Sequence, residues 1–298
     1  MDVSVIMPAY NTAEYISDAL NSILAQNFSG EYEILVSDDA SSDNTLTVLR
    51  DYVKRYPDII KLSENERNLG LSRNCESLIK RAQGKYLAFC DSDDLWTDEN
   101  KLQVQFAFMQ HNEDVGMICS PDKVDAPGHT PDLNPRGNFL DFHRLITGHG
   151  DIQNSSIMCR RDLFMAMYGQ SEWYISHNCF IDSYWAYWFT FHSAVWCMVQ
   201  PMSWYRVRKN SDCHSTDKVK HDALTKRYSL IKAYFLLTNP VAAEESLQVL
   251  SSEYDYIRAC SAYEGEIKAR STKAFRLGDA LISPYKKVRA LFKKSVNG

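Results

Sequence analysis

The chain has 298 residues, of which 45% are hydrophobic and 24% charged, and its formal net charge at pH 7 is −5. These values are typical of a globular protein and argue against disorder or a fibrous repeat. The negative balance argues against nucleic-acid binding, which needs a basic surface. The length allows one large domain or two smaller ones.

The cysteines and the N-terminal segment bear on the cellular compartment. The eight cysteines are scattered, no two have the Cys-x-x-Cys spacing of a zinc ribbon, and several lie in apolar runs, where a free thiol packs as a small hydrophobic group. The segment MDVSVIMPAYN has no basic region, and Pro8 interrupts its apolar run, so it does not resemble a signal peptide. No stretch reaches about 18 uninterrupted apolar residues. We therefore expect reduced thiols and a cytoplasmic protein.

The first 110 residues alternate strand and helix signals. Short apolar runs predict buried strands at 3–7, 34–36, 59–62 and 86–90. Apolar residues recur at helical spacing over 16–24, 46–53, 71–79 and 102–109. Asn11, with Glu14 three positions later, resembles a capping box, and Thr97 is a candidate cap for the last of these helices. The alternation predicts an α/β fold with a mostly parallel sheet and helices on both faces.

The sequence after residue 110 is less regular. A loop with three prolines covers 125–137, a strand-like run follows at 156–159, and the chain has helical character from about 217 onward. The last fifteen residues, PYKKVRALFKKSVNG, carry five basic side chains and no acidic one. On a helix the basic and apolar side chains of this tail separate onto two sides. The tail, 284–298, therefore either lies on a membrane surface or packs on the body of the protein.

Polar side chains follow three of the predicted strands. Tyr10 and Asn11 come after the first strand, Asp38 and Asp39 after the second, and the run Asp91–Asp94 after the fourth. In sheets of this kind, ligands bind at the carboxyl ends of the strands. Because parallel strands end at the same edge, we expect the three clusters to form one site.

The run Asp91–Asp94 holds three carboxylates in four positions, directly after a buried strand. A calcium-binding EF-hand loop is excluded, because Trp96 and Leu102 stand where such a loop needs glycine and glutamate. Leu95 argues against a haloacid-dehalogenase-type phosphatase, which carries Thr or Val there, and no dinucleotide or P-loop motif is present. The interpretation left is Mg²⁺ or Mn²⁺ that bridges these carboxylates and a substrate diphosphate.

Four motifs together resemble the inverting family 2 glycosyltransferases, of the type that builds bacterial surface polysaccharides. They are VSVIMPAYN at 3–11, VSDDASSDNT at 36–45, NLGLSRN at 68–74 and FCDSDDLW at 89–96, in the order and spacing of that family. Three later segments are similar to acceptor-side segments of the family: NSSIMCRRDLF at 154–164, FIDSYWAYWF at 180–189 and WYRVRKNSDCHS at 204–215. The resemblance implies the GT-A fold, a Rossmann-like α/β architecture.

The resemblance also implies roles for the donor-side residues. Tyr10 would stack on the nucleotide base, with Pro8 and Asn11 shaping the turn around it. Asp39 would accept a hydrogen bond from the base, which suits the N–H of uracil, and Arg73 would face the nucleotide or its phosphates.

A second group of residues follows the fourth strand. Asp91 would reach the ribose or a metal-bound water, Ser92 belongs to the same donor-binding turn, and Asp93 would ligate Mn²⁺ or Mg²⁺. For Asp94 we expect a loop cap before the next helix. His214 is a candidate third metal ligand, although the family's histidine usually stands where this chain has Arg208, so a solvated loop histidine is the alternative.

The same resemblance implies a catalytic base. Inversion is a single displacement, in which one carboxylate must take the proton of the acceptor hydroxyl. Asp182, in FIDSYWAYWF, matches the place of that base, and the alternative role is a helix N-cap. The nearby aromatic residues either form a sugar platform or pack in the core: Trp173, Tyr174, Trp185 and Trp188.

These inferences define a domain organisation and a function. We expect a nucleotide-sugar-binding half at 1–110, an acceptor-binding half of the same domain at 111–216, and a helical C-terminal extension at 217–298. The expected activity is metal-dependent transfer of a hexosyl-type sugar from a nucleotide-diphosphate donor, with UDP favoured, to a carbohydrate or lipid-linked acceptor, at the cytoplasmic face of the membrane. The alternative is a non-catalytic sugar-nucleotide-binding protein of the same fold.

Overall fold

The computed structural model describes residues 1–124, 138–140, 152–168 and 181–207, together with a few isolated positions between 142 and 242. By its contacts the chain divides into two compact units, Met1–Lys218 and Val219–Gly298. Almost all the described residues belong to the first unit. The C-terminal extension, its basic tail 284–298, and the loop 125–137 lie outside the described residues.

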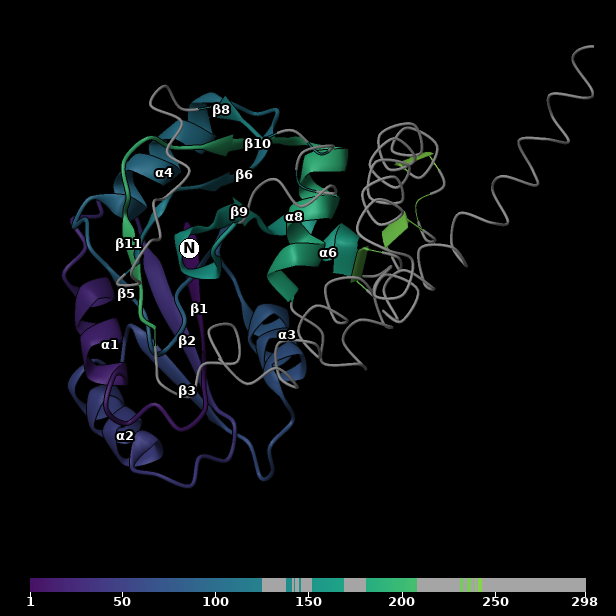
Figure 1. Ribbon diagram of the computed structural model, residues 1–298. Helices are drawn as coiled ribbons and strands as arrows, with labels where there is room; N and C mark the ends of the chain where they lie inside the picture. Colours follow the sequence, from purple (N-terminus) through teal and green to yellow (C-terminus); the bar gives the residue numbers. More distant parts are fainter. Residues whose placement is uncertain are drawn as a thin grey trace, which may run out of the picture. The chain divides into compact units, whose positions relative to one another are not determined.

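The first unit is built on an eight-stranded sheet with the strand order β3-β2-β1-β4-β9-β6-β10-β8 (Figure 1). The strands β3, β2, β1 and β4 are parallel, β6 and β10 are parallel to each other, and β9 and β8 run antiparallel to their neighbours. The strands are β1 (Val3–Ala9), β2 (Tyr32–Asp38), β3 (Ile60–Glu64), β4 (Tyr86–Phe89), β6 (Val115–Cys119), β8 (Asn138–Phe139), β9 (Met158–Arg160) and β10 (Ala194–Cys197). The α/β class with a mostly parallel sheet, predicted from the sequence, is confirmed.

A second, three-stranded sheet has the order β5-β11-β7. Its strands are β5 (Leu95–Trp96), β7 (Asp122–Val124) and β11 (Ser203–Tyr205). β11 pairs antiparallel with β5 and parallel with β7. This small sheet brings the chain around residue 205 next to the segment that directly follows the acidic run Asp91–Asp94.

Helices cover both faces of the large sheet (Figure 1). On one face lie α1 (Ile16–Leu24), α2 (Thr45–Arg55) and α4 (Lys101–His111); on the other lie α3 (Leu71–Arg81), α6 (Arg161–Tyr168) and α8 (Ile181–His192). β1 is buried along its whole length. Because helices cover both faces of the sheet, a central strand such as β1 is buried on both of its sides.

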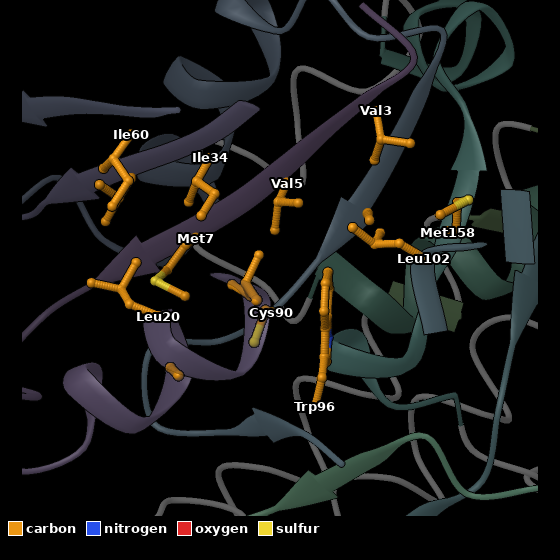
Figure 2. Packing of buried hydrophobic residues seen from close by; sticks show 14 of the residues in the cluster. Val3, Val5, Met7, Leu20, Ile34, Ile60, Cys90, Trp96, Leu102 and Met158 are labelled. Carbon is orange, nitrogen blue, oxygen red and sulfur yellow. The ribbon is translucent and has the colours of Figure 1, made fainter. Parts of the chain in front are cut away.

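The core on the α1, α2 and α4 face is continuous across the sheet (Figure 2). Alternate residues of β1, Val3, Val5 and Met7, point to this face and pack with Leu20 of α1 and Ile34 of β2. Five cysteines in the described ranges are free thiols: Cys75, Cys90, Cys119, Cys159 and Cys197. No helix among the residues that the structure describes is both long and apolar enough to cross a membrane.

The aromatic block packs on the opposite face. Trp185 is 1% exposed, and its ring centroid lies 4.7 Å from that of Phe89 and 4.7 Å from that of Phe164. Trp188 is 4% exposed and stacks on His192 at 4.3 Å. These two tryptophans are therefore core residues, and a sugar platform built from them is wrong. Trp173 and Tyr174 lie outside the described residues.

Two of the predicted helix caps are wrong. α1 begins at Ile16, five residues after Asn11, and no side chain caps it. α4 begins at Lys101 with Asn100 at its N-cap position, so Thr97 does not cap it either. In both places the polar side chain lies in a longer loop, whose path is fixed by contacts with distant parts of the chain.

A turn before β4 leaves no room for a side chain at Gly84. A Cβ atom there would lie 2.4 Å from the backbone nitrogen of Ser4 and 2.6 Å from the carbonyl carbon of Val3. The amide of Gly84 also donates to the hydroxyl of Ser4 at 2.8 Å. A larger residue at this position must push the turn away from β1.

We expect Gly84→Ala to lower the free energy of unfolding by about 1–3 kcal/mol, the usual cost of overpacking a tight contact. Denaturation by urea measures it. The matched control is Gln83→Ala, because the neighbouring Gln83 is exposed and its contacts with Ser4 and Glu33 use only its backbone amide. Equal stability of the two variants would contradict the expectation.

Candidate functional site

The loops after β1 and β2 are joined by hydrogen bonds at the carboxyl edge of the sheet. Asn11 has a φ of 51°, a left-handed conformation that asparagine tolerates better than most residues. Its backbone amide donates to the Ser41 hydroxyl at 2.9 Å, and its side-chain oxygen accepts from the Ser42 amide at 2.8 Å. The predicted turn-shaping role of Asn11 thus has a structural counterpart, since this residue holds the two loops together.

Two further bonds continue this connection. The amide of Thr12 donates to the Thr45 hydroxyl at 2.8 Å, and the amide of Ala13 donates to the Asp43 carboxylate at 3.1 Å. Partial burial tends to raise the pKa of Asp43, but hydrogen bonds from Thr45 and Ala13 outweigh it and hold that pKa below its usual value. The loop between β1 and α1 is therefore fixed against the start of α2.

Asp39 lies in the turn after β2 and is 2% exposed. One carboxylate oxygen accepts from the Asn65 side chain and the Leu69 amide, both at 2.8 Å, and the other accepts from the Gly70 amide at 2.9 Å. A carboxylate offers about four acceptor positions. Asp39 therefore anchors the loop before α3 and has capacity for one more donor, as the predicted contact with a base requires.

The other predicted donor-side residues lie on elements that end or begin at the same edge. Pro8 is buried within β1, and Tyr10, just beyond the strand, is 47% exposed. Arg73 is exposed on the first turn of α3. The exposed ring of Tyr10 has the accessible face that stacking on a base needs. The roles of these residues in binding stay predictions.

The acidic run after β4 is bound to the short 3₁₀ helix η1 (Asn154–Ser156), which precedes β9. Because β9 pairs with β4, η1 lies beside the end of β4, where the Phe89 amide donates to the Ile157 carbonyl. The side chain of Asn154 donates to the Asp91 carboxylate at 2.7 Å. The Ser155 hydroxyl accepts from the Asp91 amide at 3.0 Å and donates to the Asp94 carboxylate at 2.6 Å.

Asp94 is buried at 3% exposure and does not act as the predicted helix cap. Besides Ser155, the backbone amide of Arg206 donates to it at 3.0 Å. Burial raises the pKa of Asp94 well above its usual value, and the charges of Asp91 and Asp93 add to the rise, whereas the hydrogen bonds from Ser155 and Arg206 lower it. Asp94 therefore has a structural role, because its hydrogen bonds join the acidic run to η1 and to the end of β11.

Arg206 completes this junction from the other side. Its guanidinium pairs with Asp18 of α1 at 3.1 Å and lies 4.9 Å from the centre of the Tyr15 ring. The backbone of Arg206 binds Asp94 while its side chain binds the first turns of α1. Three segments far apart in the sequence, around residues 15–18, 91–94 and 203–206, therefore meet here.

A buried lysine side chain lies close to η1. Lys101 is 0% exposed, its ammonium group donates to the Gln105 side chain at 2.9 Å, and it lies 4.2 Å from the centre of the Trp96 ring. Gln105 in turn donates to the Ser156 carbonyl, and the Trp96 indole donates to the Ser155 carbonyl, both at 2.9 Å. The hydrogen bond from Gln105 thus fixes η1 to helix α4.

The residues at the end of β4 fit a divalent cation. Asp91 and Asp93 are only partly buried, and their charges raise the pKa of Asp94, so negative charge accumulates at this edge. Carboxylate oxygens are the donors that Mg²⁺ and Mn²⁺ prefer. Within the described ranges, no group of three or more His, Cys, Asp or Glu side chains is close enough to hold a metal without other ligands. Such an ion would depend on substrate oxygens as well.

For two predicted residues, Asp182 and His214, the described part of the chain does not include the side chain. Asp182 is the second residue of α8, where a negative charge is favourable near the helix N-terminus, and its side chain is outside the described part. His214 lies outside the described residues altogether. The predictions that Asp182 is the catalytic base and that His214 binds the metal therefore stay predictions.

A cavity of about 500 Å³ lies elsewhere, along the edge strand β3. Its lining includes Arg50, Lys54, Lys61 and Arg81 and contains none of the predicted site residues. Arg50 is paired with Glu64 at 2.6 Å, and the Lys61 ammonium donates to the Pro57 carbonyl. The residues predicted to bind the donor therefore do not line this cavity.

Asn154 and Ser155 were predicted only as part of an acceptor-side segment, NSSIMCRRDLF, and not as partners of the acidic run. A further signal was the polar triplet NSS directly before an apolar strand, where all three residues turn out to be buried. Polar side chains that are buried need partners. With β9 placed beside β4, those partners are the residues of the acidic run.

Comparisons with known proteins agree with this arrangement. The model of the family "Glycosyl transferase family 2" matches residues 4–167. WfgD of Escherichia coli, a UDP-Glc:α-D-GlcNAc-diphosphoundecaprenol β-1,3-glucosyltransferase, is 42% identical over 41% of this chain and 52% of its own length. TuaG of Bacillus subtilis, a putative teichuronic acid biosynthesis glycosyltransferase, is 32% identical over 53% of this chain and 59% of its own length. The chain thus spans about half the length of these curated relatives.

Solved structures share the fold. TarS 1-349 of S. aureus in complex with UDP-GlcNAc has a TM-score of 0.68 at 18% identity, over 95% of this chain and 81% of that one. A mannosyltransferase of Pyrobaculum calidifontis in complex with GDP-Man and Mn²⁺ has a TM-score of 0.52 at 16% identity, over 96% of this chain and 87% of that one. The fold implied by the family resemblance is confirmed.

We expect Ser155→Ala to lower the free energy of unfolding by about 1–3 kcal/mol, because it leaves the Asp91 amide without its acceptor and Asp94 without one of its donors. Thermal and urea unfolding measure the loss. The matched control is Ser77→Ala, which removes a hydroxyl bonded only to the Asn74 carbonyl of its own helix. If Ser155→Ala is as stable as the wild type and the control, the hydrogen bonds of the Ser155 hydroxyl do not stabilise the fold.

Proposed function

The chain belongs to glycosyl transferase family 2, and from this membership and the strand-end site we propose that it transfers a sugar from a nucleotide-diphosphate donor to a carbohydrate hydroxyl, with inversion. The observation that carries the proposal is the acidic run Asp91–Asp94 at the end of β4, next to the loops after β1 and β2. A diphosphate needs a cation there, and a base needs a stacking partner nearby.

The residues that bind the nucleotide donor lie in the described part of the chain. The base stacks on the exposed ring of Tyr10, and Asp39 accepts its N–H through the acceptor position that the loop before α3 leaves free. Uracil carries such an N–H, and UDP is the nucleotide that we propose. Arg73, exposed on α3, faces the phosphates.

Asp93 and Asp91 are the residues that would hold a divalent cation in this site. When bound, Mg²⁺ or Mn²⁺ supplies positive charge that stabilises the departing nucleoside diphosphate. The Asp91 carboxylate is held by the side-chain amide of Asn154, and the Asp91 backbone amide is held by the Ser155 hydroxyl. A prepared site of this kind does not need to reorganise when the substrate binds.

The chemical step is one displacement. The acceptor hydroxyl oxygen attacks the anomeric carbon and forms the new C–O bond, the bond from that carbon to the diphosphate oxygen breaks, and its electron pair leaves with the nucleoside diphosphate. The hydroxyl proton goes to the Asp182 carboxylate. Because attack comes from the face opposite the leaving group, the configuration at the anomeric carbon inverts.

The acceptor is proposed to be a lipid-linked saccharide. The name of WfgD gives a diphosphoundecaprenol acceptor for that relative, and TuaG is named for polysaccharide assembly. The basic composition of the tail 284–298 supports the further proposal that the reaction takes place at the cytoplasmic face of the membrane, whose anionic surface attracts basic side chains.

We expect Asp182→Asn to reduce the turnover of sugar transfer by roughly 10²–10⁴-fold, the usual contribution of a general base, and to leave the affinity for the nucleotide donor unchanged. Transfer is measured with radiolabelled donor, and affinity by calorimetry. The matched control is Asp162→Asn, the exposed second residue of α6, which should not change the turnover.

Full transfer by Asp182→Asn would contradict the role of this residue. A wild-type protein that binds donor but transfers no sugar to any saccharide acceptor would favour the other candidate, a non-catalytic sugar-nucleotide-binding protein.

We expect Asp93→Asn to abolish the dependence of nucleotide binding on the metal. Calorimetry with UDP should show tighter binding by the wild type in Mn²⁺ than in EDTA, and no such difference for the variant, because one ligand of the cation is lost. Asp51→Asn, an exposed change on α2, is the control. Equal binding by the wild type with and without Mn²⁺ would contradict the metal role.

A further inference from the structure

Asn154 is a buried polar residue at the edge of the proposed donor site. It is 8% exposed and is the first residue of η1. Its side-chain amide group donates to the Asp91 carboxylate at 2.7 Å. Its side-chain oxygen is buried and has no hydrogen-bond partner among the residues that the structure describes. An unsatisfied buried acceptor is rare and calls for an explanation.

Loose packing does not explain this unsatisfied oxygen, because hydrogen bonds hold the other two residues of η1. The Ser155 hydroxyl binds both Asp91 and Asp94, the Ser155 carbonyl accepts from the Trp96 indole, and the Ser156 carbonyl accepts from Gln105. The turn cannot rotate to bring the Asn154 oxygen to another partner without breaking these bonds. Its amide end is also fixed by the charged acceptor Asp91.

The chemistry of the position indicates what the missing partner is. A side-chain amide oxygen accepts from an O–H or N–H group. It lies on the same residue that orients Asp91, so the partner approaches beside this carboxylate. A nucleotide sugar brings hydroxyl groups to such a place on its ribose and on its sugar, and a bound cation brings water.

We infer that Asn154 is a ligand-binding residue of the donor site: its N–H orients Asp91, and its side-chain oxygen accepts an O–H of the bound nucleotide sugar or of a water on its cation. The inference rests on the proposed function, because the hydroxyl belongs to the donor of that site. Asparagine suits the position because it supplies both a donor and an acceptor, whereas an aspartate would add a fourth negative charge to Asp91, Asp93 and Asp94.

The test is calorimetric binding of nucleotides to the full chain. The wild type is first titrated with UDP, dTDP and GDP, and the nucleotide that binds is then used with and without an attached sugar, each in Mn²⁺ and in EDTA. The variants are Asn154→Ala and Asn154→Leu, the second of which fills the space if the first fails to fold. Ser156→Ala is the control, because that hydroxyl bonds only to the Gln153 carbonyl.

We expect both Asn154 variants to bind at least one of these ligands about tenfold more weakly, as loss of a buried hydrogen bond predicts, while Ser156→Ala binds normally. Weaker binding of the free nucleotide in EDTA identifies a ribose hydroxyl. Weaker binding only in Mn²⁺ identifies a contribution through the cation, either by a water on it or by the orientation of Asp91, and weaker binding only of the nucleotide sugar identifies a sugar hydroxyl.

Two results overturn the inference and differ from each other. If both Asn154 variants bind every probe as the wild type does, even with a lower melting temperature, Asn154 has a structural role alone. If the wild type binds no nucleotide at all, the proposed function itself fails.

Discussion

The hydrogen bonds of the Ser155 hydroxyl hold the site together. This one group accepts from the Asp91 amide and donates to the Asp94 carboxylate, so it joins η1 to the acidic run after β4. Asp94 extends the connection to the backbone of Arg206, whose side chain reaches α1. This buried hydroxyl thus links the end of β4 to the turn before β9 and, through Asp94, to the end of β11.

The same junction has an electrostatic consequence. Asp94 is buried near Asp91 and Asp93, and burial together with the charges of these two residues raises the pKa of Asp94. Asp91 and Asp93 are only partly buried, whereas Asp94 is buried and accepts hydrogen bonds from Ser155 and Arg206. Asp94 thus helps to build the fold, and the proposed binding role belongs to Asp91 and Asp93.

Much of this arrangement follows from local sequence patterns. The alternation of short apolar runs with helical periodicity predicted β1, β2, β3 and β4 and the helices between them, because these signals depend on neighbouring residues alone. The prediction that the site lies at the strand ends followed from the parallel sheet. The caps at Asn11 and Thr97 were wrong, because the loop containing Asn11 is fixed by contacts with the loop after β2, and Thr97 is bound by its backbone to Met202. The roles of Asp94 and Asn154 depend on the pairing of β4 with β9, which no local pattern reveals.

The central claim is that a nucleotide diphosphate and its cation bind at the ends of β1, β2 and β4. A crystal structure of the protein grown with UDP and Mn²⁺, with data collected at the manganese absorption edge, tests it most directly. The account predicts an anomalous peak at about 2.2 Å from a carboxylate oxygen of Asp93, with the base against Tyr10. A nucleotide bound instead in the basic cavity along β3, lined by Arg50 and Lys61, would contradict it.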